Sequence, residues 1–423
     1  MQAGSLPWTM WRALALLVLS GLLNYVDRSN LSIGATDIQR DLHLSNYQLG
    51  VLLSAFFWTY ALSQLLYIAG WLVDRLNVCW ILAAGVALWS FATGVSGLVN
   101  SLVVLFALRL LLGAGESVAY PGYSRIIVNC FPEHHRGFSN AAIDAGTKLG
   151  PAIGALLGGL LIPRVGWRIF FVVLGIAGLI WTVVWVLWMP KSARLGSGTR
   201  AESNFGVVLR QPELYWTAIG LFCSNYFWYF LITWLPPYLE QERHFPKPKM
   251  AVFSSLSYLS IALSSVASGW LSDRWIARGG SPTLVRKTFA GCGLGLSTVL
   301  IAVQVTNDVT IAMALLLFAC VAFGMYTSNV FAISQTLAGP GAAGQWTGVQ
   351  NGFANLAGVA APWFTGWITQ QTGDFFLAFL ASATAVLISA AAYVFGIRRI
   401  ELRIMGESRQ GLVSADKSGS QSL

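Results

Sequence analysis

The segment Leu108–Arg125, LRLLLGAGESVAYPGYSR, holds two charged residues, Arg109 and Glu116, in a stretch otherwise long and apolar enough to cross a lipid bilayer. Seven residues of α-helix turn through roughly 700°, so the two side chains project from nearly the same face, about 10 Å apart along the axis. A charge at the centre of a bilayer costs about 2.5 to 3.5 kcal/mol on insertion scales. The pair therefore predicts a functional site, or else a salt bridge that packs helices together.

The composition of the whole chain is that of a polytopic membrane protein. Of the 423 residues, 56% are hydrophobic and only 10% are charged, and the mean hydropathy is +0.63, which excludes a soluble domain of ordinary composition. The five cysteines have no CxxC spacing and no accompanying histidines, so we expect neither a disulfide framework nor a metal site. The net charge of +9 is not gathered into a basic run, so nucleic acid is not an expected partner.

Apolar segments of about 20 residues, the length of a helix that crosses a bilayer, recur along the chain and predict an all-α membrane protein with twelve transmembrane helices. The first follows a single Arg12 and lacks a small-residue cleavage site, so we expect a retained helix rather than a signal peptide. The predicted helices cover about 11–36, 46–72, 79–98, 101–130, 137–163, 167–190, 212–240, 249–272, 286–305, 309–336, 343–372 and 375–398.

The distribution of lysine and arginine predicts the orientation, because cytoplasmic loops carry an excess of positive charge. With both termini inside, sixteen of the 26 fall on cytoplasmic stretches: Arg12, Arg75, Arg136, Lys191, Arg194, Arg200, Arg210, Arg274, Arg278, Arg286, Lys287, Arg398, Arg399, Arg403, Arg409 and Lys417. Six fall outside: Arg40, Arg164, Arg168, Arg243, Lys247 and Lys249. The excess favours cytoplasmic termini.

An internal repeat predicts two halves. The motif GWLVDR at 70–75 returns as GWLSDR at 269–274, each after an even-numbered helix of its half, and parallel duplication of a six-helix unit is a transporter architecture. The longest internal polar stretch falls between the sixth and seventh segments. We therefore expect an N-terminal half over 1–190, a cytoplasmic linker over 191–211, a C-terminal half over 212–400 and a disordered polar tail over 401–423.

Glycines repeat every four residues in two of the predicted helices. They are Gly150, Gly154 and Gly158 in the fifth helix and Gly348 and Gly352 in the eleventh. Because this spacing leaves a shallow groove along one helix face, it predicts close approach of a neighbouring helix.

Several motifs together resemble a known transporter family. GWLVDR and its repeat resemble the cytoplasmic loop motif of the major facilitator superfamily. NYVDRSNLS at 24–32, the charged fourth helix and FPEHHRG at 131–137 narrow the resemblance to its anion:cation symporters. That family includes bacterial carriers of galactonate, glucarate and hexuronates and organic-anion carriers of animal vesicles and lysosomes. The similarity runs from about Leu14 to Ile400 and is closest to the galactonate:proton symporters.

The resemblance implies roles for the charged residues. Asp27 and Glu116 would be the proton-coupling acids, and Arg28 the main anion ligand, since a guanidinium presents a planar fork of donors to a carboxylate. Asp27 and Arg28 are adjacent and project about 100° apart on a helix, so each can meet a different partner. Two internal salt bridges, Asp27 with Arg109 and Glu116 with Arg28, are the expected resting arrangement.

The same resemblance implies polar substrate contacts. The hydroxyl and amide groups that a sugar acid needs would come from Tyr25, Tyr60, Ser328 and Asn351, and from Thr147, which stands where the symporters have a glutamine. Two further contact positions become Val330 and Phe331, so we expect a less polar pocket than one built for galactonate.

Further charged residues are expected to support the site or the gating loops. Asp144 and Lys148 lie one helical turn apart and form either a self-neutralising pair or a second cation for a second carboxylate. Arg109 supports the central charges. The gating-loop residues are Asp74, Arg75, Asp273 and Arg274, although Asn77, Val78 and Cys79 depart from the loop pattern of the superfamily.

The sequence as a whole predicts a monomeric proton-coupled importer of an organic anion, with a sugar acid as the expected substrate, in the inner membrane of a bacterium. Its partners would be the anion, protons and the lipid bilayer. It contains no nucleotide-binding loop, HExxH or GxSxG motif, so we expect no cofactor and no enzymatic activity. An anion exchanger of the same fold, in which Glu116 is structural, and a non-transporting membrane sensor remain the alternatives.

Overall fold

The computed structural model describes residues 8–131, 133–189, 205–339 and 342–401. Within these ranges every regular element is a helix. The helices are α1 (Trp8–Ile33), α2 (Ala35–Asp41), α3 (Asn46–Leu65), α4 (Ile68–Arg75), α5 (Val78–Ser96), α6 (Leu102–Glu116), α7 (Ala119–Cys130), α8 (Glu133–Trp188), α9 (Phe205–Leu209), α10 (Pro212–Gln241), α11 (Lys247–Ala277), α12 (Pro282–Ser297), α13 (Leu300–Val305), α14 (Val309–Ala338), α15 (Ala343–Ala354), α16 (Ala357–Thr372), α17 (Phe376–Ala391) and the π-helix η2 (Ala392–Gly396).

Nine helices in the described ranges are long and apolar enough to cross a membrane, and three structural details relate them to the twelve predicted segments. α8 merges the fifth and sixth segments across Gly166, which has a positive φ of 80°. The second segment is divided into α3 and α4, and the eleventh into α15 and α16. The twelve-segment prediction is therefore consistent with the fold.

Local chemistry explains where several helices begin and break. Ser45 starts α3 with a capping box, in which its side chain and that of Gln48 bond each other's backbone. Asp308 accepts from two backbone amides at the start of α14. The fourth predicted segment breaks between α6 and α7 because Pro121 has no N–H to donate to the carbonyl of Ser117, one turn earlier. This break directly follows Glu116.

The predicted boundaries of the linker and tail lie partly outside the described residues. Of the linker over 191–211, residues up to 204 are not described, and α9 occupies 205–209. Of the tail over 401–423, only Glu401 is described. The division of the chain at these boundaries stays a prediction.

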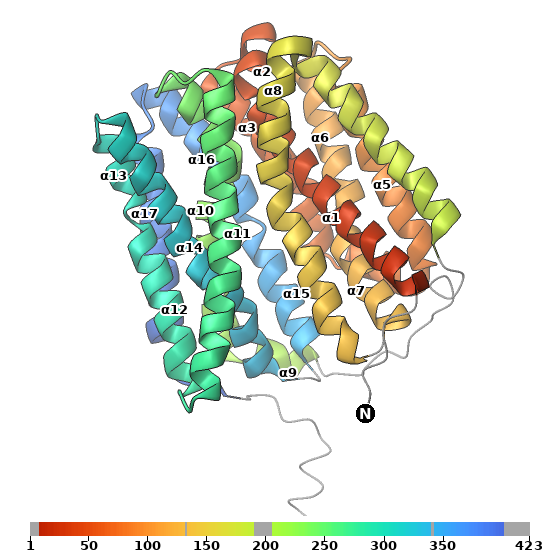
Figure 1. Ribbon diagram of the computed structural model, residues 1–423, viewed down its shortest axis with the longest axis vertical. Helices are drawn as coiled ribbons and strands as arrows, with labels where there is room; N and C mark the ends of the chain where they lie inside the picture. The colour runs from red at the N-terminus through yellow and green to blue at the C-terminus, as the bar shows by residue number, and fades with distance from the viewer. Residues whose placement is uncertain (1–7, 132, 190–204, 340–341, 402–423) are drawn as a thin grey trace, which may run out of the picture.

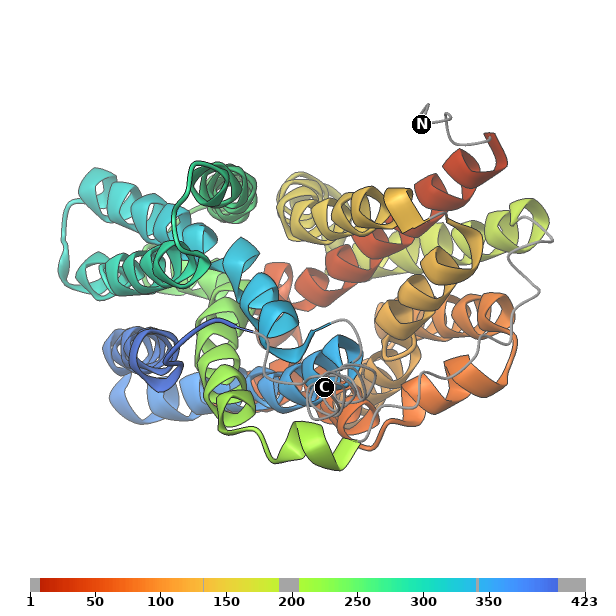
Figure 2. The ribbon, with the colours of Figure 1, turned by 90° about the horizontal axis from the view of Figure 1, so that it is seen from below.

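The helices form two bundles, seen side by side in Figure 2. In the first, α1 and α5 pack on α8, and α6 packs on α3 and α5; in the second, α14 packs on α11 and α12, and α17 packs on α10. The bundles meet where α8 packs on α11 and where α3 packs on α16. α2 lies at one end of this interface and α9 at the other (Figure 1).

Glycines hold α1 firmly against α8. A Cβ atom on Gly150 would lie 2.6 Å from Tyr25 Cβ, and one on Gly154 would lie 2.8 Å from Ser29 Oγ. The predicted close approach is therefore confirmed in this helix, and it fixes the position of α1. In the eleventh predicted helix the prediction holds for Gly352, on which a Cβ atom would lie 3.2 Å from Leu65 Cδ2, but not for Gly348, on which a Cβ atom would meet no described residue within 4 Å.

The two bundles are tied together at the end that carries α2. Lys247 Nζ of α11 lies 2.7 Å from Asp37 Oδ2 of α2 and 3.0 Å from Glu240 Oε2 at the end of α10. The hydroxyl of Thr36 in α2 also donates to Glu240. These residues line a cavity of about 740 Å³ at this end. We call this cluster of Thr36, Asp37, Glu240 and Lys247 the α2-end latch.

Candidate functional site

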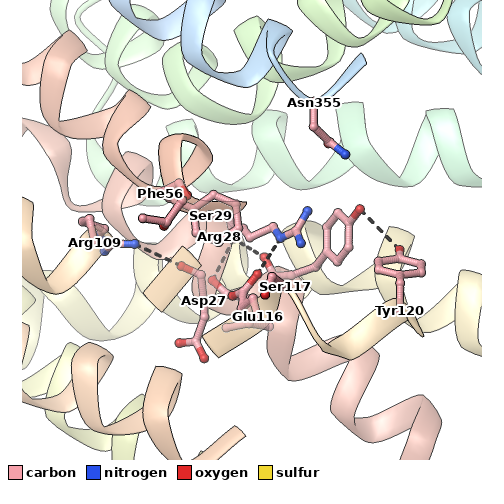
Figure 3. Close-up of polar contacts among 12 residues, drawn as sticks. Asp27, Arg28, Ser29, Phe56, Arg109, Glu116, Ser117, Tyr120 and Asn355 are labelled. Atoms are coloured by element: carbon pink, nitrogen blue, oxygen red, sulfur yellow. Dashed lines mark hydrogen bonds and ion pairs between the residues drawn. The ribbon is translucent and has the colours of Figure 1, made fainter. Parts of the chain in front are cut away.

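Two helices of the first bundle bring four charged residues to its centre. α1 carries Asp27 and Arg28, and α6 carries Arg109 and Glu116. Asp27, Arg109 and Glu116 are buried, and the side chain of Arg28 is only 4% exposed. Asp27 and Arg28 point in different directions, as expected for neighbours on a helix (Figure 3). Four ionisable groups at this depth are the strongest candidate for a functional site.

Arg28 and Glu116 form the predicted ion pair. Arg28 Nε donates to Glu116 Oε2 at 2.7 Å (Figure 3), a charge-assisted bond across two helices. Only one edge of each group is used, because Arg28 Nη2 and Glu116 Oε1 are both buried and have no hydrogen-bond partner among the described residues. The pair therefore leaves a donor and an acceptor available at the centre of the protein.

Aromatic rings surround the Arg28 guanidinium. Its carbon lies 4.7 Å from the ring centre of Tyr25, 4.9 Å from that of Phe56 and 4.5 Å from that of Tyr60. Cation–π contacts of this kind stabilise a cation without using its hydrogen-bond donors. The hydroxyl of Tyr120 in α7 donates to that of Tyr25 at 3.4 Å. Tyr25 and Tyr60, two of the predicted substrate contacts, thus lie beside the predicted anion ligand.

The predicted salt bridge between Asp27 and Arg109 is not formed. Arg109 Nη1 instead donates to the backbone oxygen of Asp27 at 3.4 Å, and Nη2 donates to Asn30 Oδ1 at 2.7 Å. Asn30 Nδ2 in turn donates to Asp27 Oδ1 at 3.3 Å. The amide of Asn30 therefore stands between the two charges, since it lies one turn along α1 from Asp27 and offers both a donor and an acceptor.

The predicted contact Thr147 lies on α8 and packs against α1. Its hydroxyl donates to the carbonyl of Asp144 at 2.7 Å, and its methyl group faces Gly21. Lys148 forms an ion pair with Asp144 within the same helix. Of the two possibilities for Lys148, this arrangement is the self-neutralising pair.

Among the described residues, no hydrogen bond or ion pair joins the predicted contacts of the second bundle to the charged residues of the first. Ser328 on α14 lies 3.2 Å from the hydroxyl of Ser268 and accepts from Asn329 Nδ2. The side chain of Asn351 on α15 is half-buried, and its carbonyl accepts from Asn355 Nδ2 at 2.9 Å. Their assignment to the substrate site stays a prediction.

The repeated motifs form matching structures in the two bundles. Arg75 stacks on Trp71 at 5.2 Å, and Arg274 stacks on Trp270 at the same distance. Asp273 interacts electrostatically with Arg286 on α12. The side chain of Asp74 lies outside the described part of the structure. A gating role for Asp74, Arg75, Asp273 and Arg274 stays a prediction.

Three polar residues near the charges were not predicted from the sequence. Asn30 bridges Arg109 and Asp27, and its place one helical turn from Asp27 was a usable signal. Tyr229 on α10 donates to Asn355 Oδ1 at 2.5 Å, and its ring lies 4.4 Å from that of Phe57 on α3. Figure 3 shows Asn355 across from Arg28. No spacing in the sequence links Tyr229 to Asn355.

The chemistry available at this centre is ion binding and proton transfer. Carboxyl groups can exchange protons, and an arginine with free donors can hold an anion. Among the described residues there is no group of three or more His, Cys, Asp or Glu side chains that could hold a metal ion.

Bundles of membrane-spanning helices around buried charges define a multi-pass membrane transporter. The model of the family described as "Major Facilitator Superfamily" matches residues 17–362. The chain belongs to this superfamily, whose members are transporters and not enzymes. Among solved structures, the fold is similar to that of a bacterial homologue of the human lysosomal transporter Spinster in an inward-facing and unoccupied conformation. The TM-score is 0.79 and the sequence identity is 21%, and the match covers 92% of this chain and 97% of that chain.

Curated relatives match over nearly the whole chain. A probable galactarate/D-glucarate transporter of Bacillus subtilis is 30% identical, with 95% of each chain covered. A hexuronate transporter of the same organism is 30% identical, over 94% of this chain and 97% of its own. A D-galactonate transporter of Escherichia coli is 29% identical, over 90% and 94%. The resemblance to sugar-acid transporters is thereby confirmed at the level of the family.

Proposed function

We propose that this protein is a proton-coupled symporter that imports an organic anion, a sugar acid such as galactonate, glucarate or a hexuronate, by alternating access. The proposal places it in a bacterial inner membrane with both termini in the cytoplasm. It is supported by the names of the relatives and by the excess of lysine and arginine on the α9 side of the membrane.

The observation that carries the proposal is the incomplete pairing of Arg28. Its Nε is bonded to Glu116, while its Nη2 is buried without a partner. A substrate carboxylate needs two parallel donors for a bidentate contact, and Glu116 occupies one edge of the same guanidinium. An ionised Glu116 therefore competes with the substrate, and a protonated Glu116 releases Arg28 to it.

Linkage makes this competition a coupling mechanism. If protonation of Glu116 favours anion binding, anion binding must favour protonation by the same factor. Asp27 is the second proton-coupling acid in the proposal. The Asp27 carboxylate forms no salt bridge with Arg109, because the amide of Asn30 lies between them and bonds both. Asp27 can therefore gain or lose a proton without breaking a direct salt bridge.

The α2-end latch fits one state of an alternating-access cycle. With the termini in the cytoplasm, the end that carries α2 faces outward, and the contacts of Lys247 with Asp37 and Glu240 join the bundles there. In the proposal this conformation is closed to the outside, and transport requires these contacts to break.

Uptake into proteoliposomes tests the proposal. Labelled galactonate, glucarate and glucuronate are offered with and without an inward proton gradient. A symporter accumulates at least one of them only with the gradient. An exchanger shows counterflow from preloaded vesicles that does not depend on the gradient, and a sensor binds without any uptake.

A further inference from the structure

Tyr229 connects the two bundles next to Arg28. It belongs to α10, and its buried ring packs on Phe57 of α3 with 4.4 Å between ring centres. Its hydroxyl donates to Asn355 Oδ1 at 2.5 Å. Asn355 lies at the break between α15 and α16. One phenol thus contacts a helix of the first bundle and the interrupted helix of the second.

The hydrogen bonds of Tyr229 and Asn355 determine which further hydrogen bonds the Tyr229 hydroxyl can make. A tyrosine hydroxyl has one proton and two acceptor lone pairs. The proton is used on Asn355 Oδ1, and Asn355 is held in this orientation because its Nδ2 donates to the carbonyl of Asn351 at 2.9 Å. Among the described residues no side chain or amide donates to Tyr229 Oη. The oxygen is therefore left as an acceptor.

Arg28, which only donates, belongs to the same region of the protein. The ring of Phe57, on which Tyr229 packs, lies 4.8 Å from that of Phe56, and the Phe56 ring lies 4.9 Å from the Arg28 guanidinium carbon. Asn355, the partner of Tyr229, lies across from Arg28 in Figure 3. Arg28 Nη2 is a buried donor without a partner. A small molecule between them would meet donors on the side of the first bundle and an acceptor on the side of the second.

We propose that Tyr229, held by Asn355, is a specificity-determining residue that selects anions bearing a hydroxyl group close to the carboxylate. The carboxylate binds Arg28, and the neighbouring hydroxyl donates its proton to Tyr229 Oη. This inference rests on the proposed function and names the residue of the second bundle that would recognise the hydroxyl group beside the carboxylate. An acid without that hydroxyl leaves the phenol oxygen buried and unpaired, so it binds roughly tenfold or more weakly.

Asn355 acts in this proposal as a positioning residue. Without its oxygen, the Tyr229 hydroxyl would be free to turn its proton toward the substrate. A substrate hydroxyl can accept from a phenol as well as donate to it, so the preference for a hydroxyl group would shrink, because the phenol is no longer held in one orientation, while the carboxylate contact to Arg28 persisted. This effect on selectivity distinguishes positioning from a loss of packing, which would weaken all ligands alike.

The test compares two acids that differ by a single hydroxyl group. Binding of 2-hydroxyhexanoate and of hexanoate to the purified full-length protein in lipid nanodiscs is measured by calorimetry. Wild-type protein should bind the hydroxy acid at least about tenfold more tightly. Tyr229→Phe should bring the two affinities within about twofold by weakening only the hydroxy acid, and Asn355→Leu should also reduce the ratio. Tyr215→Phe, on the same helix but exposed and bonded to Leu209, should leave the ratio unchanged.

The outcomes separate this inference from the function on which it rests. If both acids bind, and Arg28→Lys weakens both, but the hydroxyl group makes no difference in wild type, the selection by Tyr229 is overturned and anion binding stands. A wild-type preference that survives in Tyr229→Phe also overturns it. If neither these acids nor D-galactonate, glucarate or glucuronate binds, the proposed function fails and the inference fails with it. If Tyr229→Phe does not fold, Asn355→Leu takes its place, and an unchanged ratio of the two affinities in that variant overturns the selection by Tyr229.

Discussion

Arg28 and Glu116 are joined by a single hydrogen-bonded contact of 2.7 Å, and each keeps one unpartnered polar atom beside it. A fully bidentate pair would satisfy both groups and would be hard to open, since breaking a buried pair costs about 3 to 5 kcal/mol. In the proposed mechanism, a third group, either an anion or a proton, takes over one member of this singly bonded pair.

Neutralising Glu116 should separate binding from accumulation. Glu116→Gln mimics the protonated acid, so it should bind substrate with little dependence on pH, whereas wild-type affinity should rise as the pH falls. The variant should retain exchange but not concentrate substrate against a gradient. Uptake and counterflow in proteoliposomes measure both, with Glu242→Gln at the α2 end as a control. Gradient-driven accumulation by Glu116→Gln would move the coupling role to Asp27.

Replacing Arg28 by lysine should weaken anion binding although the charge is kept. A lysine lacks the planar fork of donors, so the affinity should fall by about 1.5 to 3 kcal/mol, the range for hydrogen bonds to charged groups. Equilibrium binding of labelled galactonate measures the loss. Arg40→Lys, in an exposed pair with Asp37, is the matched control. An unchanged affinity would exclude Arg28 from the site.

Removing the amide of Asn30 should destabilise the protein. In Asn30→Leu the buried Arg109 Nη2 loses its 2.7 Å partner, and an unsatisfied buried donor costs about 1 to 3 kcal/mol. Thermal unfolding in detergent should show a lower midpoint. Asn140→Leu removes only an exposed bond to the carbonyl of Arg136 and should have little effect. Equal midpoints for the two variants would contradict the bridging role.

Breaking the α2-end latch should favour opening at that end. Lys247→Ala leaves Asp37 and Glu240 without the cation that pairs with both. The equilibrium between the closed and open conformations of this end should shift toward the open one by up to about 1 kcal/mol, since both ion pairs are partly exposed to solvent. Spin labels on either side of the latch should report a larger fraction of long distances. Lys249→Ala, whose ammonium stacks on Phe245 instead, should not change the distribution.

The orientation can be checked by labelling. In a protein without its native cysteines, a cysteine at position 200 should react with a membrane-impermeant reagent only from the cytoplasmic side, because the predicted linker carries part of the positive charge excess. Reaction from the outside would reverse the assignment of both ends of the molecule, including that of the latch.

The apolar segments could be predicted because a bilayer imposes a minimum length on every crossing helix. Their interruptions were harder to predict. The break after Glu116 has a visible cause in Pro121, whereas no proline lies within four residues of Asn355 to mark the second break. The glycine pattern predicted how α1 packs on α8 and how Gly352 lies against Leu65, whereas Gly348 meets no described residue within 4 Å.

The charged residues of the candidate site could be predicted, but only some of its neutral residues, such as Tyr25 and Tyr60. A buried Asp or Arg in an apolar segment stands out in the sequence because its insertion is costly. Amides and hydroxyls are less costly and more common, so Asn30 had only its spacing from Asp27 as a signal, and Asn355 had none. Their roles depend on which side chain faces which across helices distant in the sequence, as the contact between Tyr229 and Asn355 illustrates.

The charged residues and the Tyr229–Asn355 pair come from different bundles, and this has an evolutionary consequence. Arg28 and Glu116 belong to the first bundle, while Tyr229 and Asn355 belong to the second. In the proposed mechanism, substitutions in the second bundle can alter which anion is accepted without touching the groups that harness the proton gradient. Natural or laboratory selection can therefore change the transported anion through substitutions in the second bundle, while the proton coupling of the first bundle is retained.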